Sequence, residues 1–248
     1  MKETDISRAI IGEYNKRLLE HLENDVVIVG AGPAGLTAAY YLSSAGVKTA
    51  VLEKRLSIGG GIWAGAAGYS IVVFEDKEIL DELNITTRKE KNLYIADAIE
   101  FATALGYKAK KAGAEIFNLT EAEDIILKTD AVEGVVVNST HLRMAGLPVD
   151  PLCISSKYLI DATGHPAEVV NMLKKRRGDL FPKELMESFM NVEAAETGVV
   201  EKAGEIYPGL YVAGMSVCSA FNLCRMGPIF GGMLKSGKKV AELIINAK

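Results

Sequence analysis

The chain has 248 residues, of which 49% are hydrophobic and 24% are charged, which suffices to bury the core of one α/β domain over residues 1–248. A net charge of −4 without a long basic run argues against nucleic acid as a partner. No apolar run approaches the roughly 20 residues that cross a bilayer, and the three cysteines form no C-x-x-C pair, so we expect a cytoplasmic protein with reduced thiols and no membrane partner.

The first predicted element is an amphipathic helix over residues 4–22. Its apolar positions recur at every fourth residue: Ile6, Ile10, Tyr14, Leu18 and Leu22. Because this helix precedes the first strand, its apolar face needs a separate partner. Either the sheet or another subunit would serve, and the sequence leaves both open.

A strand, a glycine-rich loop and a helix follow at once. The β-branched run at 26–29 predicts a strand buried on both faces. Gly30, Gly32 and Gly35 then have the spacing G-x-G-x-x-G, and a helix over 36–42 leaves the loop. Such glycines allow a tight turn, room for a pyrophosphate and close helix–strand packing. The helix start offers free N–H groups and partial positive charge to the pyrophosphate.

An acidic residue completes this pattern. The predicted strand at 48–52 ends next to Glu53, at about the spacing at which an acid binds ribose hydroxyls. A glycine-rich turn without a ligand is the alternative, but it leaves Glu53 unexplained. We therefore predict an adenine dinucleotide site.

A second glycine-rich loop, IGGGIWAGAAG, occupies residues 58–68 and contains Trp63, the single tryptophan. Three adjacent glycines permit backbone conformations closed to other residues. We expect this loop to line the site opposite the first loop, with a flexible connector as the alternative.

The middle of the chain predicts an antiparallel β-meander inserted at about residues 112–140. Its strands are expected at 114–118, 124–128 and 131–138, with Thr129-Asp130 in a hairpin turn. A short helix is predicted at 76–83 and a longer one at 94–105 before it. Further helices are predicted at 166–175, 183–189 and 229–246, and a buried strand at 209–214.

The strand predicted at 156–160 ends in the sequence DATGH, residues 161–165. A parallel strand that ends in this way puts its loop at the carboxyl edge of the sheet, where ligands bind. His165 is therefore expected near the nucleotide, where either a structural or a catalytic role is open to it.

The order of these motifs resembles the glutathione-reductase-like flavoproteins, which share the first glycine loop, the A-T-G strand end and a late G-L-Y-x-A-G-D strand. In those flavoproteins the final Asp holds the ribityl chain of FAD. Here the position is Met215, which cannot accept a hydrogen bond of that quality. The resemblance implies an α/β dinucleotide-binding fold with a central parallel sheet and favours NAD over FAD.

The chain is also similar, almost from end to end, to the thiamine thiazole synthase family, especially its archaeal, sulfide-using branch. The motifs are GAGPAG at 30–35, IGGGIW at 58–63, VDP at 149–151, IDATGH at 160–165 and RMGPIFGGM at 225–233. The last is the most specific of them.

This resemblance implies a sulfide-dependent adenosine diphosphate thiazole synthase of thiamine biosynthesis, a transferase that consumes NAD. NAD would lose nicotinamide, and the exposed ribose carbon would condense with glycine. Addition of sulfur, mediated by Fe(II), would give an adenylated thiazole carboxylate. Members form rings of subunits, so we expect a homo-oligomer, an octamer by resemblance, that takes NAD, glycine and sulfide.

Position in the motifs implies roles for individual residues. Asp150 and His165 would be catalytic metal ligands from neighbouring subunits, and Arg225 would be catalytic by binding the glycine carboxylate with its planar fork. An acid and an imidazole form a weakly held Fe(II) set with open positions for sulfide and substrate. The residues that contact the dinucleotide would be Gly30, Gly32, Ala34, Gly35, Glu53, Lys54, Gly61 and Met215.

Pro148 departs from the family pattern. Eukaryotic members carry here a cysteine that donates its own sulfur, and archaeal members commonly carry a histidine. Proline has neither a thiol nor a titratable group, so external sulfide is the expected donor, and Cys153 lies beyond Pro151. Two alternatives stay open: an FAD- or NAD-dependent oxidoreductase of the same superfamily, and an impaired relative that binds NAD without turning it over.

Overall fold

The computed structural model describes residues 2–146, 148–182 and 184–247. The strands of its main sheet are β1 (Glu23–Val29), β2 (Thr49–Glu53), β6 (Glu115–Asn118), β7 (Thr120–Lys128), β8 (Ala131–Ser139), β9 (Leu152–Asp161), β10 (Gly204–Tyr207) and β11 (Leu210–Val212). A smaller sheet contains β3 (Ile71–Phe74), β4 (Thr87–Glu90) and β5 (Leu93–Asp97). The helices are α1 (Glu3–Glu20), α2 (Pro33–Ser44), α3 (Glu78–Glu82), α4 (Ala98–Ala112), α5 (Thr140–Met144), α6 (Glu168–Lys174), α7 (Val192–Lys202), α8 (Met215–Ala220) and α9 (Gly231–Asn246), with 3-10 turns at Ile62–Ala64 and Gly178–Leu180.

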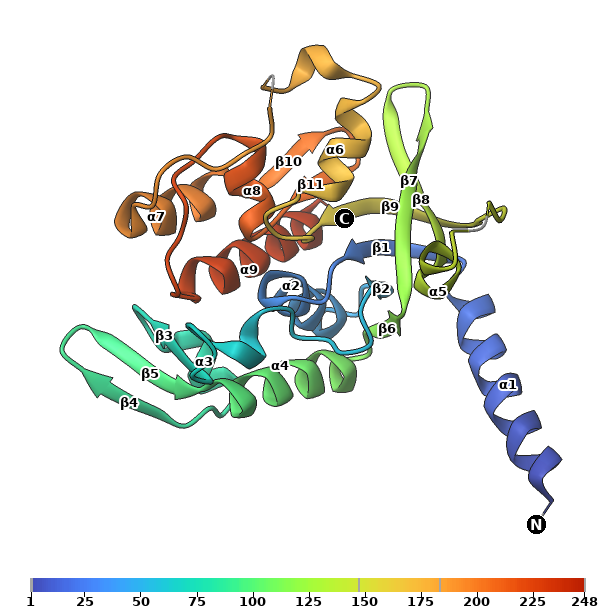
Figure 1. Cartoon of the computed structure of the whole chain (residues 1–248), viewed down its shortest axis with the longest axis horizontal. Coiled ribbons are helices and arrows are strands. Elements are labelled where there is room, and N and C mark those ends of the chain that lie inside the picture. Colours follow the sequence, from blue (N-terminus) through green and yellow to red (C-terminus); the bar gives the residue numbers. More distant parts are fainter. Residues whose placement is uncertain (1, 147, 183, 248) are drawn as a thin grey trace.

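The main sheet has the order β10-β11-β9-β1-β2-β6, and the hairpin β7–β8 joins it through β9 (Figure 1). The neighbours β11–β9, β9–β1, β1–β2 and β2–β6 are all parallel. The predicted α/β fold with a central parallel sheet is therefore confirmed. β1 lies in the middle, so its loop opens between the strands that flank it.

Two apolar cores lie on the two faces of the sheet. Helices α2, α4 and α9 supply the first core, and the β7–β8 hairpin with α6 supplies the second. Val26 and Ile28 belong to the first core, whereas Val27 and Val29 belong to the second. Alternate side chains of a strand point to opposite faces, which confirms the prediction that this strand is buried on both sides.

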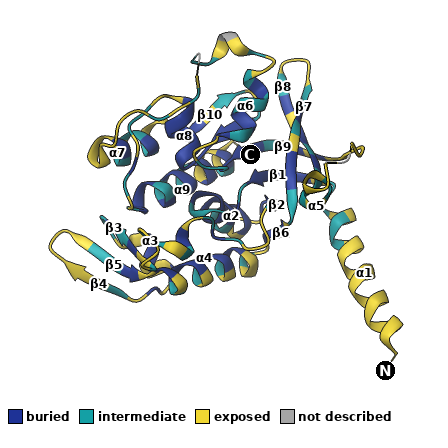
Figure 2. Cartoon of the chain, in the orientation of Figure 1, coloured by how far each residue is buried: buried dark blue, intermediate teal, exposed yellow. Residues whose placement is uncertain are grey.

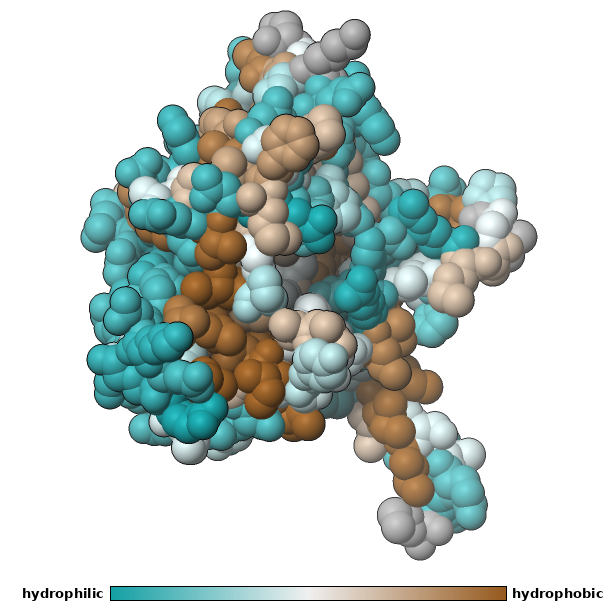
Figure 3. All heavy atoms as spheres, turned by 60° about the vertical axis from the view of Figure 1, so that its left-hand side comes forward, coloured by the Kyte–Doolittle hydropathy of each residue, from teal (hydrophilic) through white to brown (hydrophobic). Residues whose placement is uncertain are grey.

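Helix α1 is present as predicted, but it projects from the body of the molecule (Figures 1 and 2). None of its residues is buried. Its last turn is attached where Arg17 forms an ion pair with Glu115 and Leu18 packs on the second core. Figure 3 shows an apolar stripe on this helix, and the helix residues Ile6 and Ile10 are exposed. The main sheet of the same chain therefore covers little of the helix.

The prediction of a helix over 94–105 is wrong in its first part. Leu93–Asp97 forms β5 and pairs with β3 and β4 in a sheet that the sequence pattern missed. The Asp97 side chain then accepts hydrogen bonds from the backbone N–H groups of Ile99 and Glu100. This N-cap starts α4 at Ala98, because such a cap satisfies donors that the first turn leaves free.

The prediction of a helix over 183–189 is also wrong for residues 184–189, which are not helical; Lys183 lies outside the described residues. The backbone N–H of Ser188 donates to the carbonyl of Leu223, and the N–H of Arg225 donates to the carbonyl of Phe189. These bonds to a distant segment replace the bonds that a helix would make within itself.

The predicted hairpin is confirmed, but the strand at 114–118 is not part of an antiparallel meander, because β6 pairs parallel with β2 in the main sheet. β7 and β8 pair antiparallel on either side of Thr129 and Asp130, and Thr129 has a left-handed φ of 51°. β8 continues the antiparallel pairing to β9. In the described part of the chain, no helix combines the length and the apolar character that spanning a bilayer requires.

Candidate active site

A cavity of about 720 Å³ lies at the carboxyl edge of the parallel strands. It is lined by Gly30 after β1, Glu53 at the end of β2, Thr163 after β9 and Gly214 after β11. In open parallel sheets, ligands bind in this crevice beyond the strand ends. The motifs that are separate in sequence therefore meet in one cavity.

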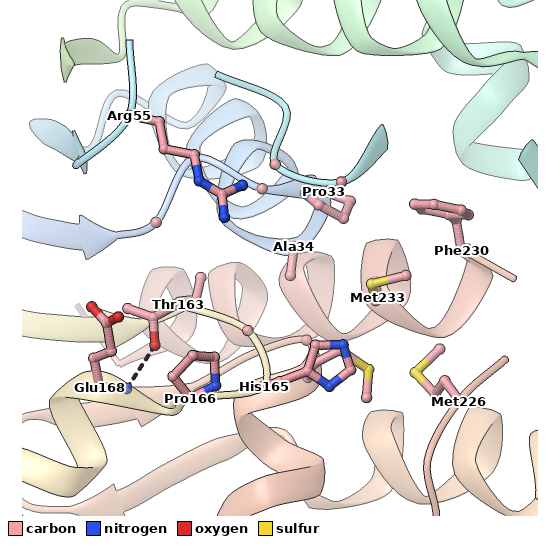
Figure 4. Close-up of a pocket in the computed structure, with 18 of the residues that line it drawn as sticks. Pro33, Ala34, Arg55, Thr163, His165, Pro166, Glu168, Met226, Phe230 and Met233 are labelled. Atoms are coloured by element: carbon pink, nitrogen blue, oxygen red, sulfur yellow. Dashed lines mark hydrogen bonds between the residues drawn. The ribbon is translucent and has the colours of Figure 1, made fainter. Parts of the chain in front are cut away.

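Figure 4 shows how side chains face one another across this cavity. Ala34 and Arg55 lie on one wall, from the first glycine loop and the end of β2. Thr163 and His165 lie on the opposite wall, in the loop after β9. Phe230 closes one end. Most of the lining residues are apolar or glycine, and a few polar side chains lie among them. Such a lining is typical of sites for small molecules and cofactors.

Each of the three glycines in the first loop occupies a position where the absence of a side chain matters. A Cβ on Gly30, which has a φ of 104°, would lie 2.4 Å from the carbonyl oxygen of Ala162. A Cβ on Gly35 would lie 2.0 Å from the carbonyl oxygen of Gly30. Gly32, in contrast, has no heavy atom within 4 Å of the position of a Cβ. Two glycines therefore permit close packing, and the third leaves open space in front of the α2 N-terminus.

Glu53 is buried and rigidly held at the cavity wall. The backbone N–H of Ala31 donates to its Oε2 at 3.0 Å, and the N–H of Arg55 donates to its Oε1 at 2.9 Å. Each carboxylate oxygen retains a lone pair for a further donor. This arrangement suits a ribose diol, as the position of Glu53 in the sequence predicts.

The second glycine-rich loop lines the cavity, so the alternative of a flexible connector is wrong. Gly60 and Gly61 are among the lining residues. The indole N–H of Trp63 donates to the carbonyl of Ile58 at 2.6 Å and closes the loop on itself. The N–H of Gly59 donates to the carbonyl of Ala31 at 2.7 Å, which joins this loop to the first one.

Lys54 and Met215, both predicted to contact the dinucleotide, also line the cavity. Lys54 forms an ion pair with Glu168 from α6, across from β2. Met215 is the first residue of α8 and is buried. A thioether thus lines the cavity at the start of α8.

Asp161 organises the loop that carries His165, and the sequence analysis did not assign it a role. It is fully buried, and it accepts hydrogen bonds from the N–H and hydroxyl of Thr163, the N–H of Val170 and the hydroxyl of Ser216. Burial raises the pKa of this carboxyl, and the four donors oppose that rise. The position of this acid directly before the A-T-G motif is the sequence feature that could have indicated its role.

His165 and Arg225 lie close together and share a carboxylate that the sequence analysis missed. Glu187 contacts Nδ1 of His165 through Oε1, and its Oε2 lies 4.0 Å from Nε of Arg225. The carbonyl of His165 accepts a hydrogen bond from the Ser219 hydroxyl at 2.7 Å. No sequence signal pointed to Glu187, because its segment was predicted to be a helix.

Asp150 is not in this cavity. It is exposed just before β9, whereas His165 follows the end of that strand. β9 spans ten residues, which corresponds to about 30 Å at roughly 3.3 Å per residue. One chain therefore does not bring the two predicted metal ligands together. Within residues 2–146, 148–182 and 184–247, no group of three or more His, Cys, Asp or Glu side chains is arranged to hold a metal.

Comparison with known proteins gives a consistent result over nearly the whole chain. The protein named thiamine thiazole synthase in Pyrococcus furiosus is 50% identical over 248 residues, which cover 99% of this chain and 98% of the relative. The protein of the same name in Methanothermobacter thermautotrophicus is 43% identical over 247 residues, covering 97% of this chain and 96% of the relative.

A solved structure is equally similar. The crystal structure of Thermovibrio ammonificans THI4 covers 100% of this chain and 98% of its own, with a TM-score of 0.96 and 44% identity. The model of the Thi4 family matches residues 7–230, a range that includes both glycine loops and most of the cavity wall. This chain belongs to the Thi4 family.

Proposed function

We propose that this protein is a thiamine thiazole synthase that consumes NAD, glycine and sulfide, uses Fe(II), and releases nicotinamide and an adenylated thiazole carboxylate. A thiazole synthase role in thiamine biosynthesis is supported by the names of relatives that are 43–50% identical over almost the full chain. The observation that carries the finer proposal is the single cavity that joins the dinucleotide loop to His165 and Arg225.

The dinucleotide end of the cavity supports NAD as the substrate. The open space at Gly32 in front of α2 accommodates a pyrophosphate, and the Glu53 carboxylate is oriented to accept the ribose hydroxyls. NAD bound in this way would direct its nicotinamide end toward Arg225 and His165, which line the same cavity. We propose that nicotinamide is released there.

Arg225 is the proposed binding group for the glycine carboxylate. Its side chain is 57% exposed, and Arg225 lines the cavity. A guanidinium binds a carboxylate through parallel N–H donors, which also orients the amine of glycine. The amine is thereby presented to the ribose carbon that nicotinamide leaves.

The side chains present fit one half of an Fe(II) site. His165 has its Nδ1 occupied by Glu187, so Nε2 is the nitrogen free to bind a metal. Asp150, exposed far from the cavity of its own chain, would supply the carboxylate from a second copy. When bound, the metal would hold sulfide for transfer to the glycine-derived adduct. This requirement for two copies supports assembly into a homo-oligomeric ring.

External sulfide is the proposed sulfur donor. Pro148 carries no thiol, and Cys153 is exposed at the start of β9. Cys218 is buried, and burial raises the pKa of its thiol to about 12, so little of the reactive thiolate forms at neutral pH. The three cysteines, Cys153, Cys218 and Cys224, all lie in the described part of the chain, and none is among the residues that line the cavity.

The direct test is anaerobic incubation of the protein with NAD, glycine, sulfide and Fe(II), followed by mass analysis of the small molecules. We expect nicotinamide and an adenylated thiazole carboxylate, and we expect no thiazole when sulfide alone is omitted. Tightly bound flavin, or hydride transfer without nicotinamide release, would support an oxidoreductase instead. NAD binding without nicotinamide release would support the impaired relative.

Variants separate the proposed roles in this reaction. We expect Arg225→Ala to weaken glycine use while sparing nicotinamide release, because Arg225 is proposed to bind only the second substrate. Equal loss of both steps would contradict that role. Asp150→Ala or His165→Ala should stop at a sulfur-free glycine adduct, and thiazole formation at the parent rate in either variant would contradict the metal assignment.

A further inference from the structure

Glu187 reaches His165 and Arg225 because its segment is extended and hydrogen-bonded to the segment that carries Arg225. Ser188 and Asn191 donate backbone hydrogen bonds to the carbonyls of Leu223 and Arg225, at 2.9 and 3.2 Å. Burial alternates along the segment: Leu185 and Glu187 point inward, and the residues between and beside them are exposed. The backbone therefore fixes the direction of the Glu187 side chain.

The Glu187 carboxylate is largely shielded from water and faces two functional side chains. Its side chain is 10% exposed, against 56% for His165 and 57% for Arg225. One oxygen contacts Nδ1 of His165, and the other lies 4.0 Å from Nε of Arg225. A carboxylate that is mostly removed from water needs such partners, because burial of an unpaired charge is costly.

We propose that Glu187 is a positioning residue that orients His165 and Arg225 together. This inference rests on the proposed function, in which His165 binds Fe(II) and Arg225 binds glycine. A carboxylate is an acceptor only, so the hydrogen on the imidazole lies on Nδ1. The lone pair of Nε2 is then directed away from Glu187, and the contact at Nδ1 fixes the orientation of the ring.

The same carboxylate acts on Arg225. The ion pair to Nε holds the guanidinium from one side, which leaves the terminal N–H donors free for the glycine carboxylate. One acidic residue thus sets the relative position of the metal ligand and the amino-acid site. Glu187 therefore holds both Arg225, the proposed glycine-binding group, and His165, the proposed ligand of the metal that would hold sulfide.

The test compares Glu187→Gln with Glu184→Gln. The first variant keeps the shape of the side chain but removes the charge, and the second removes a charge from an exposed residue of the same segment. Binding of Fe(II) alone is measured anaerobically by equilibrium dialysis. We expect about 10–100-fold weaker Fe(II) binding for Glu187→Gln, and unchanged binding for Glu184→Gln. NAD affinity and the thermal midpoint should be unchanged in both, which a merely structural role would not predict.

A second readout concerns Arg225. The KM for glycine should rise several-fold in Glu187→Gln, with the KM for NAD unchanged. Equal Fe(II) affinity, or an equal KM for glycine, in the two Gln variants would overturn the inference. His165→Ala is the reference variant. If it binds Fe(II) as tightly as the parent, the proposed metal role of His165 is wrong, and the proposed role of Glu187 is then wrong as well. If His165→Ala loses Fe(II) and Glu187→Gln does not, the role of Glu187 alone is wrong.

Discussion

Glu53 and Asp161 are both carboxylates whose oxygens accept hydrogen bonds from backbone N–H groups. Glu53 holds the ends of the first glycine loop and of β2 against each other, and Asp161 does the same for the loop before α6. Glu53 was predictable, since its distance from the glycines follows from one β-α-β unit. The role of Asp161 depends on Ser216, which no local pattern connects to it.

At this scale we predict that Glu53→Ala weakens NAD binding. Loss of a charged acceptor for ribose hydroxyls costs about 1.5–3 kcal/mol, or roughly 10–100-fold in the dissociation constant. Calorimetric titration with NAD measures the effect, and Glu123→Ala, which removes an exposed acid on β7, is the matched control. An unchanged NAD affinity in Glu53→Ala would refute the assigned contact.

At the scale of elements, the crossing of α2 and α9 positions the first glycine loop. A Cβ on Gly237 of α9 would lie 2.3 Å from the carbonyl oxygen of Ala34 in α2. Ala34 itself lines the cavity. The late helix was predicted from the end of the RMGPIFGGM motif, but its contact with the first helix of the nucleotide unit was not. Helices α2 and α9 lie near opposite ends of the chain, so no local pattern in the sequence connects them.

We predict that Gly237→Ala destabilises the fold and weakens NAD binding together. The atom it meets is backbone, which cannot rotate aside, so overpacking of about 1–3 kcal/mol is expected. The higher helix propensity of alanine offsets about 1 kcal/mol of this cost. Gly12→Ala in α1 is the control, because nothing lies within 4 Å of its Cβ position. The thermal midpoint should fall for Gly237→Ala and stay unchanged for Gly12→Ala. Equal midpoints in the two variants would show that α2 and α9 can move apart enough to accommodate the added methyl group.

At the scale of the whole molecule, a single chain holds the whole cavity proposed to bind NAD, but only one of the two proposed metal ligands lies in it. Asp150 lies beyond the opposite end of β9 from His165, and α1 exposes the apolar residues Ile6, Ile10, Ile11 and Leu19. Both features support the proposal that activity requires assembly. The helix predicted over residues 4–22 is present as Glu3–Glu20, and the main sheet of the same chain contacts it near its C-terminal end.

This proposal predicts complementation between inactive variants. Asp150→Ala and His165→Ala are each expected to lack thiazole formation. When they are mixed under conditions of subunit exchange, a site that takes its two ligands from different subunits recovers both in about one case in four. Thiazole formed per subunit measures this recovery, and each variant exchanged with itself is the control. No recovery in assemblies shown to be mixed would mean that both ligands come from one subunit.

The sequence by itself determined the features that depend on residues close together in the chain. These are the buried strand, the glycine loop and the acid at Glu53, each set by local backbone requirements and hydrophobic period. Only the tertiary structure decided that residues 184–189 are extended, because their backbone donors bond to a distant segment instead of to the preceding turn. That pairing brings Glu187 to His165 and Arg225. The tertiary structure also separates Asp150 from His165, because a fully extended strand lies between them.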